Sequence, residues 1–142
     1  MSRYEVRELL LPPYARRAPT TVAGWLRLLR AGLPGHGLER LLASLALSRA
    51  EFCAALNIPE RTLTRRLKEG RLTPEESEKV LRLARVWERA IVVFNGEEAA
   101  RDWLKSSNGA LEEASPLSLL DADIGAEAVL DLLGRIEHGV FS

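Results

Sequence analysis

Basic and hydroxyl side chains gather on one side of a short predicted helix that runs from about Pro59 to Glu69. A helix turns by about 100° per residue. One face therefore carries Arg61, Thr64, Arg65 and Lys68, and Thr62 and Arg66 flank it. Arginine and threonine side chains donate hydrogen bonds to phosphates and base edges, and the DNA major groove admits a helix. The pattern favours DNA binding. The alternative is an ordinary helical hairpin with a solvated basic face.

A helix–turn–helix would position this basic face. Ser48 and Glu51 have the spacing of a capping box, which predicts the start of a first helix. The sequence Asn57-Ile58-Pro59 should end that helix and begin the next, because proline suits the first turn of a helix. Gly70 should end the second helix, since glycine readily adopts the left-handed conformation found there.

The second helix also needs an apolar side that packs on the first. Leu63 and Leu67 lie four residues apart and opposite the basic face, so they are expected to make that contact. Arg49, in the first turn of the first helix, is expected near DNA phosphates together with Thr62 and Arg66.

Three predicted segments precede the helix–turn–helix. Residues 1–20 hold three prolines and two adjacent arginines, which indicate an extended arm that is either a disordered tail or packs on a second subunit. A helix from Thr20 or Thr21 to about Ala31 should bury a stripe made by Val22, Trp25, Leu26 and Leu29. A linker containing Gly32, Pro34, Gly35 and Gly37 should lead to a supporting helix over Leu38–Leu45.

Two longer helices dominate the remaining residues. Thr73, Pro74 and Glu76 predict the start of a helix that reaches about Asn95. Its apolar face is made by Val80, Leu83, Ala84, Trp87, Ile91 and Phe94. A short helix over Glu97–Lys105, a polar loop and one turn at Pro116–Leu120 follow. A last helix should be capped by Asp121 or Asp123 and reach about His138, with an apolar face made by Ile124, Ala128, Val129, Leu132, Leu133 and Ile136.

No segment alternates polar and apolar residues as a strand would, so the predicted class is all-α. We expect four parts: an arm over residues 1–20, a helix–turn–helix domain over 21–72, a connecting helix over 73–94 and a small helical domain over 95–142.

Charge is divided unequally along a chain whose formal net charge is zero. Residues 1–47 carry seven arginines and three acids, and residues 48–72 carry six basic and three acidic residues. Residues 95–142 carry three basic and ten acidic residues. A basic half and an acidic half suggest two partners of opposite character.

The remaining composition predicts a cytoplasmic protein. Cys53 is the only cysteine, so no intramolecular disulfide is possible. Charged residues replace the apolar run of a signal peptide near the beginning of the chain. No stretch approaches the roughly 20 apolar residues that span a membrane.

Enzymatic chemistry is the least favoured function class. His36 and His138 have no metal-ligating partner at helical spacing. The stretch GLPGHG (residues 32–37) has neither the following lysine nor the preceding strand of a phosphate loop. Asp121 and Asp123 are better explained by helix capping than as a catalytic pair. We therefore expect no catalytic residue, metal or cofactor.

Five ordered motifs resemble the Xre/MbcA/ParS antitoxins, in particular the Xre antitoxins of RES–Xre toxin–antitoxin systems. The matching segments are Arg61–Arg66 (RTLTRR), Arg71–Ser77 (RLTPEES), Ala100–Leu104 (ARDWL), Pro116–Leu120 (PLSLL) and Gly125–Val140. The resemblance covers about residues 20–142.

The resemblance implies a homodimer with two binding activities. The helix–turn–helix would bind and repress the promoter of its own operon. The carboxy-terminal domain would cover the active site of a RES-domain toxin that consumes NAD. The residues expected to contact the toxin are Trp103, Leu120, Arg135, Glu137, His138, Val140, Phe141 and Ser142. The alternative is a plain dimeric repressor without a toxin partner.

Overall fold

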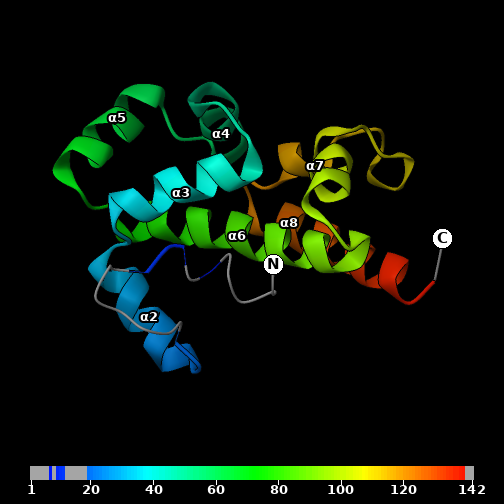
Figure 1. Cartoon of the computed structure of the whole chain (residues 1–142), viewed down its shortest axis with the longest axis horizontal. Helices are drawn as coiled ribbons and strands as arrows, with labels where there is room; N and C mark the ends of the chain where they lie inside the picture. The colour runs from blue at the N-terminus through cyan, green and yellow to red at the C-terminus, as the bar shows by residue number, and fades with distance from the viewer. Residues whose placement is uncertain (1–6, 8, 12–18, 140–142) are drawn as a thin grey trace.

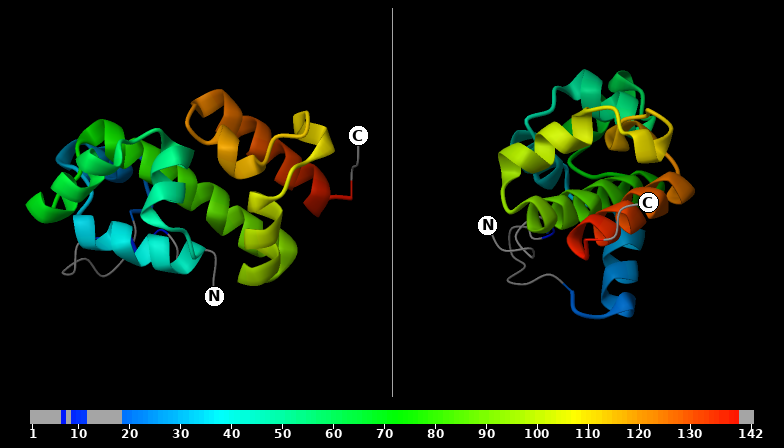
Figure 2. Two further views of the ribbon diagram at one scale, coloured as in Figure 1. Left: turned by 90° about the horizontal axis from the view of Figure 1, so that it is seen from above. Right: turned by 90° about the vertical axis from the view of Figure 1, so that its right-hand side faces the viewer.

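The longest helix, α6 (Pro74–Phe94), runs through the middle of the computed structural model, which describes residues 7, 9–11 and 19–139. Figure 1 shows α3, α4, α5 and α7 on one side of α6 and α2 on the other, and the views of Figure 2 show α8 alongside it. The helices that precede α6 are α2 (Val22–Ala31), α3 (Gly35–Leu45), α4 (Arg49–Leu56) and α5 (Glu60–Glu69). Those that follow are α7 (Glu97–Lys105), the 3₁₀ turns η1 (Gly109–Leu111) and η2 (Pro116–Leu119), and α8 (Asp123–Glu137).

The predicted all-α class is confirmed for the described residues, in which the extended pairing is one isolated bridge between Pro34 and Arg71. A single buried apolar cluster surrounds α6. It contains side chains from both halves of the chain, such as Leu41 and Val129. Trp87 is completely buried at its centre, and its indole Nε1 donates to Ser44 Oγ (3.0 Å). Since this core is continuous across residues 73 and 95, the four-part division of the chain stays a prediction.

Two capping boxes begin helices as predicted. Ser48 Oγ accepts from Glu51 N, and Glu51 Oε1 accepts from Ser48 N. Thr73 and Glu76 make the same reciprocal pair at the start of α6. Gly70 ends α5 in the left-handed conformation (φ +86°), also as predicted.

The glycine-rich linker prediction was wrong for its second half, because α3 already begins at Gly35. A backbone hydrogen bond joins Gly35 to the end of α5, and Gly37 permits close backbone contact with residue 9. The amide of Gly35 donates to Gly70 O (3.0 Å), and a Cβ on Gly37 would lie 2.6 Å from Leu9 O. Leu10 is buried beside it, so residues 9–11 pack on their own chain.

The predicted stripe of α2 is buried at one end only. Leu29 is buried, whereas Val22 is 77% exposed and Leu26 is 37% exposed. Thr21 caps the helix as one of the two expected candidates, since its Oγ1 accepts from Gly24 N. Among the residues that the structure describes, none covers the amino-terminal half of this stripe, so the predicted burial of Val22 and Leu26 was wrong.

The start of α8 also differs from the prediction. Ala122 occupies the N-cap position without a side-chain hydrogen bond, so neither Asp121 nor Asp123 caps the helix. Asp123 lies in the first turn and pairs with Arg82 of α6. Ile124, expected in the core, is 79% exposed. Among the described helices, none combines the length and apolar character needed to cross a membrane.

Candidate functional site

The face of α5 that was predicted to meet DNA is exposed. Leu63 points into the core, with 1% of its surface exposed, and Leu67 is half-buried. The exposed residues on the other side are Arg61, Thr64, Arg65 and Lys68. The helix packs on α3 and α4, and three guanidinium or ammonium groups and a hydroxyl project from its other side. Such a surface can donate hydrogen bonds to phosphates and bases.

Arg49 and Arg65 make only loose intramolecular ion pairs. Arg49 Nη2 lies 3.5 Å from Glu39 Oε1, and Arg65 Nε lies 3.8 Å from Glu69 Oε1. All four side chains are at least half exposed. Exposed pairs of this kind contribute little to stability, so both arginines can exchange a carboxylate for a phosphate at small cost.

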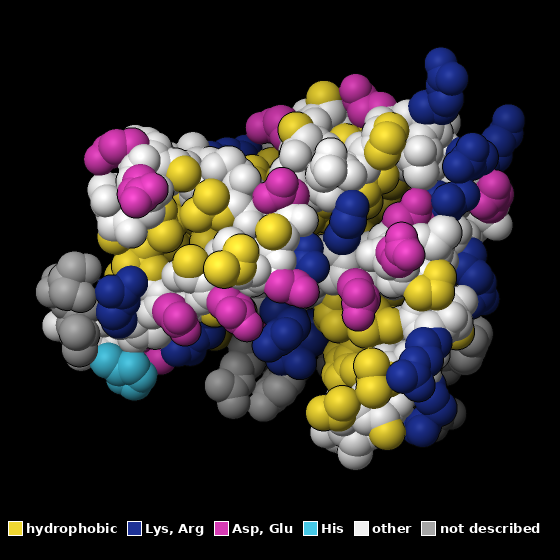
Figure 3. All heavy atoms as spheres, turned by 180° about the vertical axis from the view of Figure 1, so that it is seen from behind, with side chains coloured by type: hydrophobic (Ala, Val, Ile, Leu, Met, Phe, Trp, Pro, Cys, Tyr) yellow, Lys and Arg dark blue, Asp and Glu magenta, His cyan; other side chains and the backbone are white. Residues whose placement is uncertain are grey.

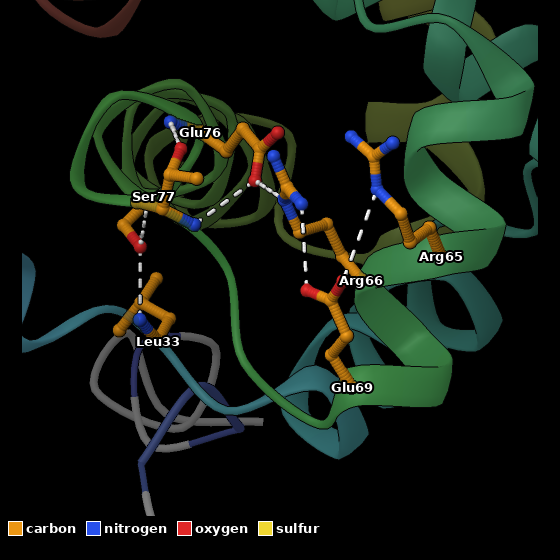
Figure 4. Close-up of polar contacts among 7 residues, drawn as sticks. Leu33, Arg65, Arg66, Glu69, Glu76 and Ser77 are labelled. Atoms are coloured by element: carbon orange, nitrogen blue, oxygen red, sulfur yellow. Dashed lines mark hydrogen bonds and ion pairs between the residues drawn. The ribbon is translucent and has the colours of Figure 1, made fainter.

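Arg66 lies in a different environment, directed at α6 (Figure 4). Its Nε donates to Glu76 Oε1 (2.7 Å), and its Nη1 lies 3.4 Å from Glu69 Oε2. The hydrogen bond to Glu76 raises the pKa of Arg66. Burial acts to raise the pKa of Glu76, but hydrogen bonds from Arg66 and Thr73 outweigh it and hold that pKa below its ordinary value. The predicted phosphate contact of Arg66 therefore competes with a half-buried ion pair. Thr62, the other flanking residue, is half-buried.

The residues predicted to contact a toxin fall into three groups. Leu120 is completely buried, and Trp103 is half-buried with its ring 5.3 Å from that of Phe94, so both support the fold of this region. Arg135 is half-buried and His138 is exposed at the end of α8. Glu137 forms an ion pair with Arg89 of α6, through distances of 2.6 and 3.0 Å. Val140, Phe141 and Ser142 lie outside the described residues.

A groove between α2, α6 and α8 was not expected from the sequence. Its lining residues are Leu29, Glu78, Leu81, Arg82, Arg85, Asp123, Ala126, Glu127 and Leu130. The exposed residues of α2 stand beside it, and Figure 3 shows hydrophobic side chains gathered over this protruding helix. The signal in the sequence was the amphipathic pattern of residues 22–31, which marks an apolar face without saying what covers it.

Metal-binding and thiol chemistry find no support among the described residues. No group of three or more His, Cys, Asp or Glu side chains there could hold a metal ion. Cys53 is buried on α4, and burial raises the pKa of its thiol, which keeps the thiol protonated at neutral pH.

Comparison with known proteins gives matches over most of the chain. Residues 24–85 match the family described as the antitoxin Xre-like helix-turn-helix domain, and residues 89–139 match the antitoxin Xre/MbcA/ParS C-terminal toxin-binding domain. A Yersinia enterocolitica protein named Antitoxin Xre is 46% identical over 99 residues, which cover 68% of this chain and 67% of the relative. A Photorhabdus laumondii protein with the same name is 32% identical over 117 residues, or 81% of this chain and 79% of the relative.

Proposed function

This chain belongs to the Xre antitoxin family, and we propose that it neutralises a toxin through its carboxy-terminal part and binds promoter DNA through α4 and α5. One observation carries the proposal: the two matched segments, residues 24–85 and 89–139, meet on the single helix α6. A helix–turn–helix and a toxin-binding segment therefore share one rigid support. A DNA partner would place the protein in the cytoplasm, which is part of the same proposal.

The proposed toxin surface lies around the last turn of α8, in the acidic carboxy-terminal segment of the chain. Arg135, Glu137 and His138 lie there, and residues 140–142 follow them in the sequence. Residues 95–142 carry ten acidic and three basic side chains, which suits a partner with a basic cleft. Because the five motifs resemble RES–Xre systems, we propose a RES-type, NAD-consuming toxin whose active site this surface covers.

The proposed DNA surface is the exposed face of α5 together with Arg49. Its exposed basic residues, Arg61, Arg65 and Lys68, project away from the core on a helix whose length suits the major groove. Binding at the promoter of its own operon would make the protein an autoregulator.

We further propose that α2 and its neighbouring groove join two copies of the chain. Val22 and Leu26 form an exposed apolar stripe on α2, and the groove combines apolar side chains such as Leu81 with charged ones of both signs. The stripe of one copy can therefore pack on the apolar side chains in the groove of another. In a symmetric dimer, the α2 stripe of each copy would pack in the groove of the other copy, so both surfaces would be buried in both copies.

Light scattering during size-exclusion chromatography tests the dimer. Val22→Ser/Leu26→Ser should shift the wild-type dimer to a monomer. Val92→Ser is a matched control, because Val92 is also apolar and exposed (38%) but lies on α6 and does not line the groove. A double variant that still elutes as a dimer would rule out this surface.

The toxin assignment is tested by co-expression with the neighbouring open reading frame. We expect cellular NAD to fall when the neighbour is expressed alone and to recover with the full chain. Removal of residues 140–142 should abolish the recovery. We choose truncation after Gly139 instead of truncation before Glu137, because the longer fragment keeps the ion pair between Arg89 and Glu137 that joins α8 to α6. Full protection by the shortened chain would contradict the proposed toxin surface. Unchanged NAD with the neighbour alone would leave a plain repressor as the better interpretation.

A further inference from the structure

The proposed recognition helix α5 is weakly anchored by apolar packing. Leu63 is its one buried residue and Leu67 is half-buried, and these two side chains lie one turn apart along the helix. Two apolar contacts on one line resist translation of the helix better than rotation about its axis. A rotation would redirect Arg61 and Arg65, so DNA recognition needs a further contact that fixes the angle.

Arg66 makes this contact from the side of α5. Its guanidinium reaches Glu76 in the first turn of α6, and Glu69 approaches the same group from the last turn of α5 (Figure 4). The side chain of Arg66 is 17% exposed and that of Glu76 is 13% exposed. Hydrogen bonds between charged groups are stronger than neutral ones and depend on direction, so the pair resists rotation of α5 more than an exposed pair would.

The first turn of α6 is itself held in place. Glu76 Oε1 also accepts from Thr73 N (2.9 Å) in the capping box. The completely buried Ser77 accepts from Leu33 N (2.8 Å) and donates to Thr73 O (2.7 Å). The amide of Leu72 donates to Leu33 O (2.9 Å). The Glu76 carboxylate is therefore held in place at the start of α6, and its hydrogen bond to Arg66 fixes α5 relative to α6.

We infer that Arg66 and Glu76 form a positioning pair that sets the angle at which α5 presents its exposed residues to DNA. The inference rests on the DNA-binding part of the proposed function. It assigns Arg66 an intramolecular role instead of a phosphate contact, because two of its nitrogen donors are directed at carboxylates.

The direction in which one substitution changes the affinity for DNA separates this role from a simple effect of net charge. Glu76→Gln removes a negative charge, and a more positive protein should bind polyanionic DNA more tightly. A positioning role predicts the opposite, a loss of about tenfold in affinity. Glutamine keeps an oxygen that can accept from Thr73 N, so the capping box is preserved, but it removes the negative charge from the acceptor that Arg66 binds. The substitution therefore weakens the bond with Arg66 and leaves the start of α6 intact. Glu51→Gln is the matched control, because Glu51 occupies the same position in the other capping box and no arginine contact of its carboxylate is seen among the described residues.

The experiment is a fluorescence anisotropy titration of a labelled promoter fragment at several salt concentrations, below the measured melting temperature of every variant. We expect weaker binding for Glu76→Gln and equal or tighter binding for Glu51→Gln. Arg66→Lys, which keeps the charge but loses the guanidinium geometry, should weaken binding as much as Arg66→Gln, with the salt dependence of wild type. Unchanged or tighter binding by Glu76→Gln overturns the inference.

A second result would also overturn it: Arg66→Lys binding like wild type, with Arg66→Gln lowering the salt slope by about one unit, as removal of a phosphate-binding side chain would. Arg61→Ala/Arg65→Ala separates this failure from failure of the proposed function. If that double variant binds as well as wild type, α5 is not the DNA surface. If it binds weakly while Glu76→Gln does not, only the positioning role fails.

Discussion

Gly125 lies in the first turn of α8, where the helix comes very close to η2. A Cβ added at Gly125 would lie 1.9 Å from Leu119 O and 2.9 Å from Leu119 C. Backbone atoms cannot rotate away as a flexible side chain can, so Gly125→Ala must separate α8 from η2. Gly134, in the same helix, has no atom within 4 Å of an added Cβ. The two glycines therefore form a matched pair of substitutions.

The expected effects on the free energy of unfolding have opposite signs. Alanine gains up to about 1 kcal/mol of helix propensity over glycine, and both variants share a gain of this kind. Gly134→Ala should thus be more stable than wild type by up to about 1 kcal/mol. Overpacking costs about 1–3 kcal/mol, and the contact with Leu119 O belongs at the upper end of that range. Gly125→Ala should then be less stable than wild type by roughly 2 kcal/mol.

Urea unfolding followed by circular dichroism measures this difference, which should be about 3 kcal/mol between the two variants, or a separation in melting temperature of roughly 10 °C. The urea m-values should stay equal, because the surface exposed on unfolding is unchanged. A Gly125→Ala protein as stable as Gly134→Ala would refute the argument that α8 and η2 require direct backbone contact.

Three further predictions concern other parts of the fold. Arg61→Ala/Arg65→Ala should weaken promoter binding and reduce the slope of log affinity against log salt by about 0.9 for each phosphate that the variant no longer binds; an unchanged slope in filter-binding titrations would remove both residues from the phosphate interface. The pKa of Glu76 is lowered in the folded state, so its ionised carboxylate should contribute about 1.5 kcal/mol to the free energy of unfolding. This contribution should be present above the ordinary pKa of 4.5 and be lost as the pH falls through the lower folded-state pKa. The difference in unfolding free energy between wild type and Glu76→Gln should accordingly shrink below pH 4.5, and a constant difference would exclude the ion pair as its source. Leu10→Ala should cost about 2–5 kcal/mol, as buried leucines do, whereas a melting temperature equal to that of wild type would show that residues 9–11 do not belong to the core.

Local signals in the sequence predicted the helices well. The capping pairs Ser48–Glu51 and Thr73–Glu76 are both made, and Gly70 ends α5, because each of these features depends on residues a few positions apart. The exposed face of α5 followed from helical periodicity in the same way. These features need no knowledge of how distant segments pack.

Features that depend on distant segments were not predictable in this way. Periodicity identified the apolar stripe of α2 but not that only its carboxy-terminal end meets α6, so Val22 was wrongly expected to be buried. The glycines at residues 35 and 37 were predicted to lie in a linker, although they begin α3, where Gly37 allows close contact with Leu9. The ion pair between Arg66 and Glu76 was not predicted, because the two residues belong to different helices.

The central claim is that one chain binds DNA at α5 and a toxin at the end of α8. The most direct test is the growth rate of cells that express the proposed toxin, together with wild type, Arg61→Ala/Arg65→Ala, or the chain shortened after Gly139. We predict that the double arginine variant restores growth as wild type does and that the shortened chain does not. Growth restored by the shortened chain, or abolished with the arginine variant, would contradict the claim that the two activities occupy opposite ends of the molecule.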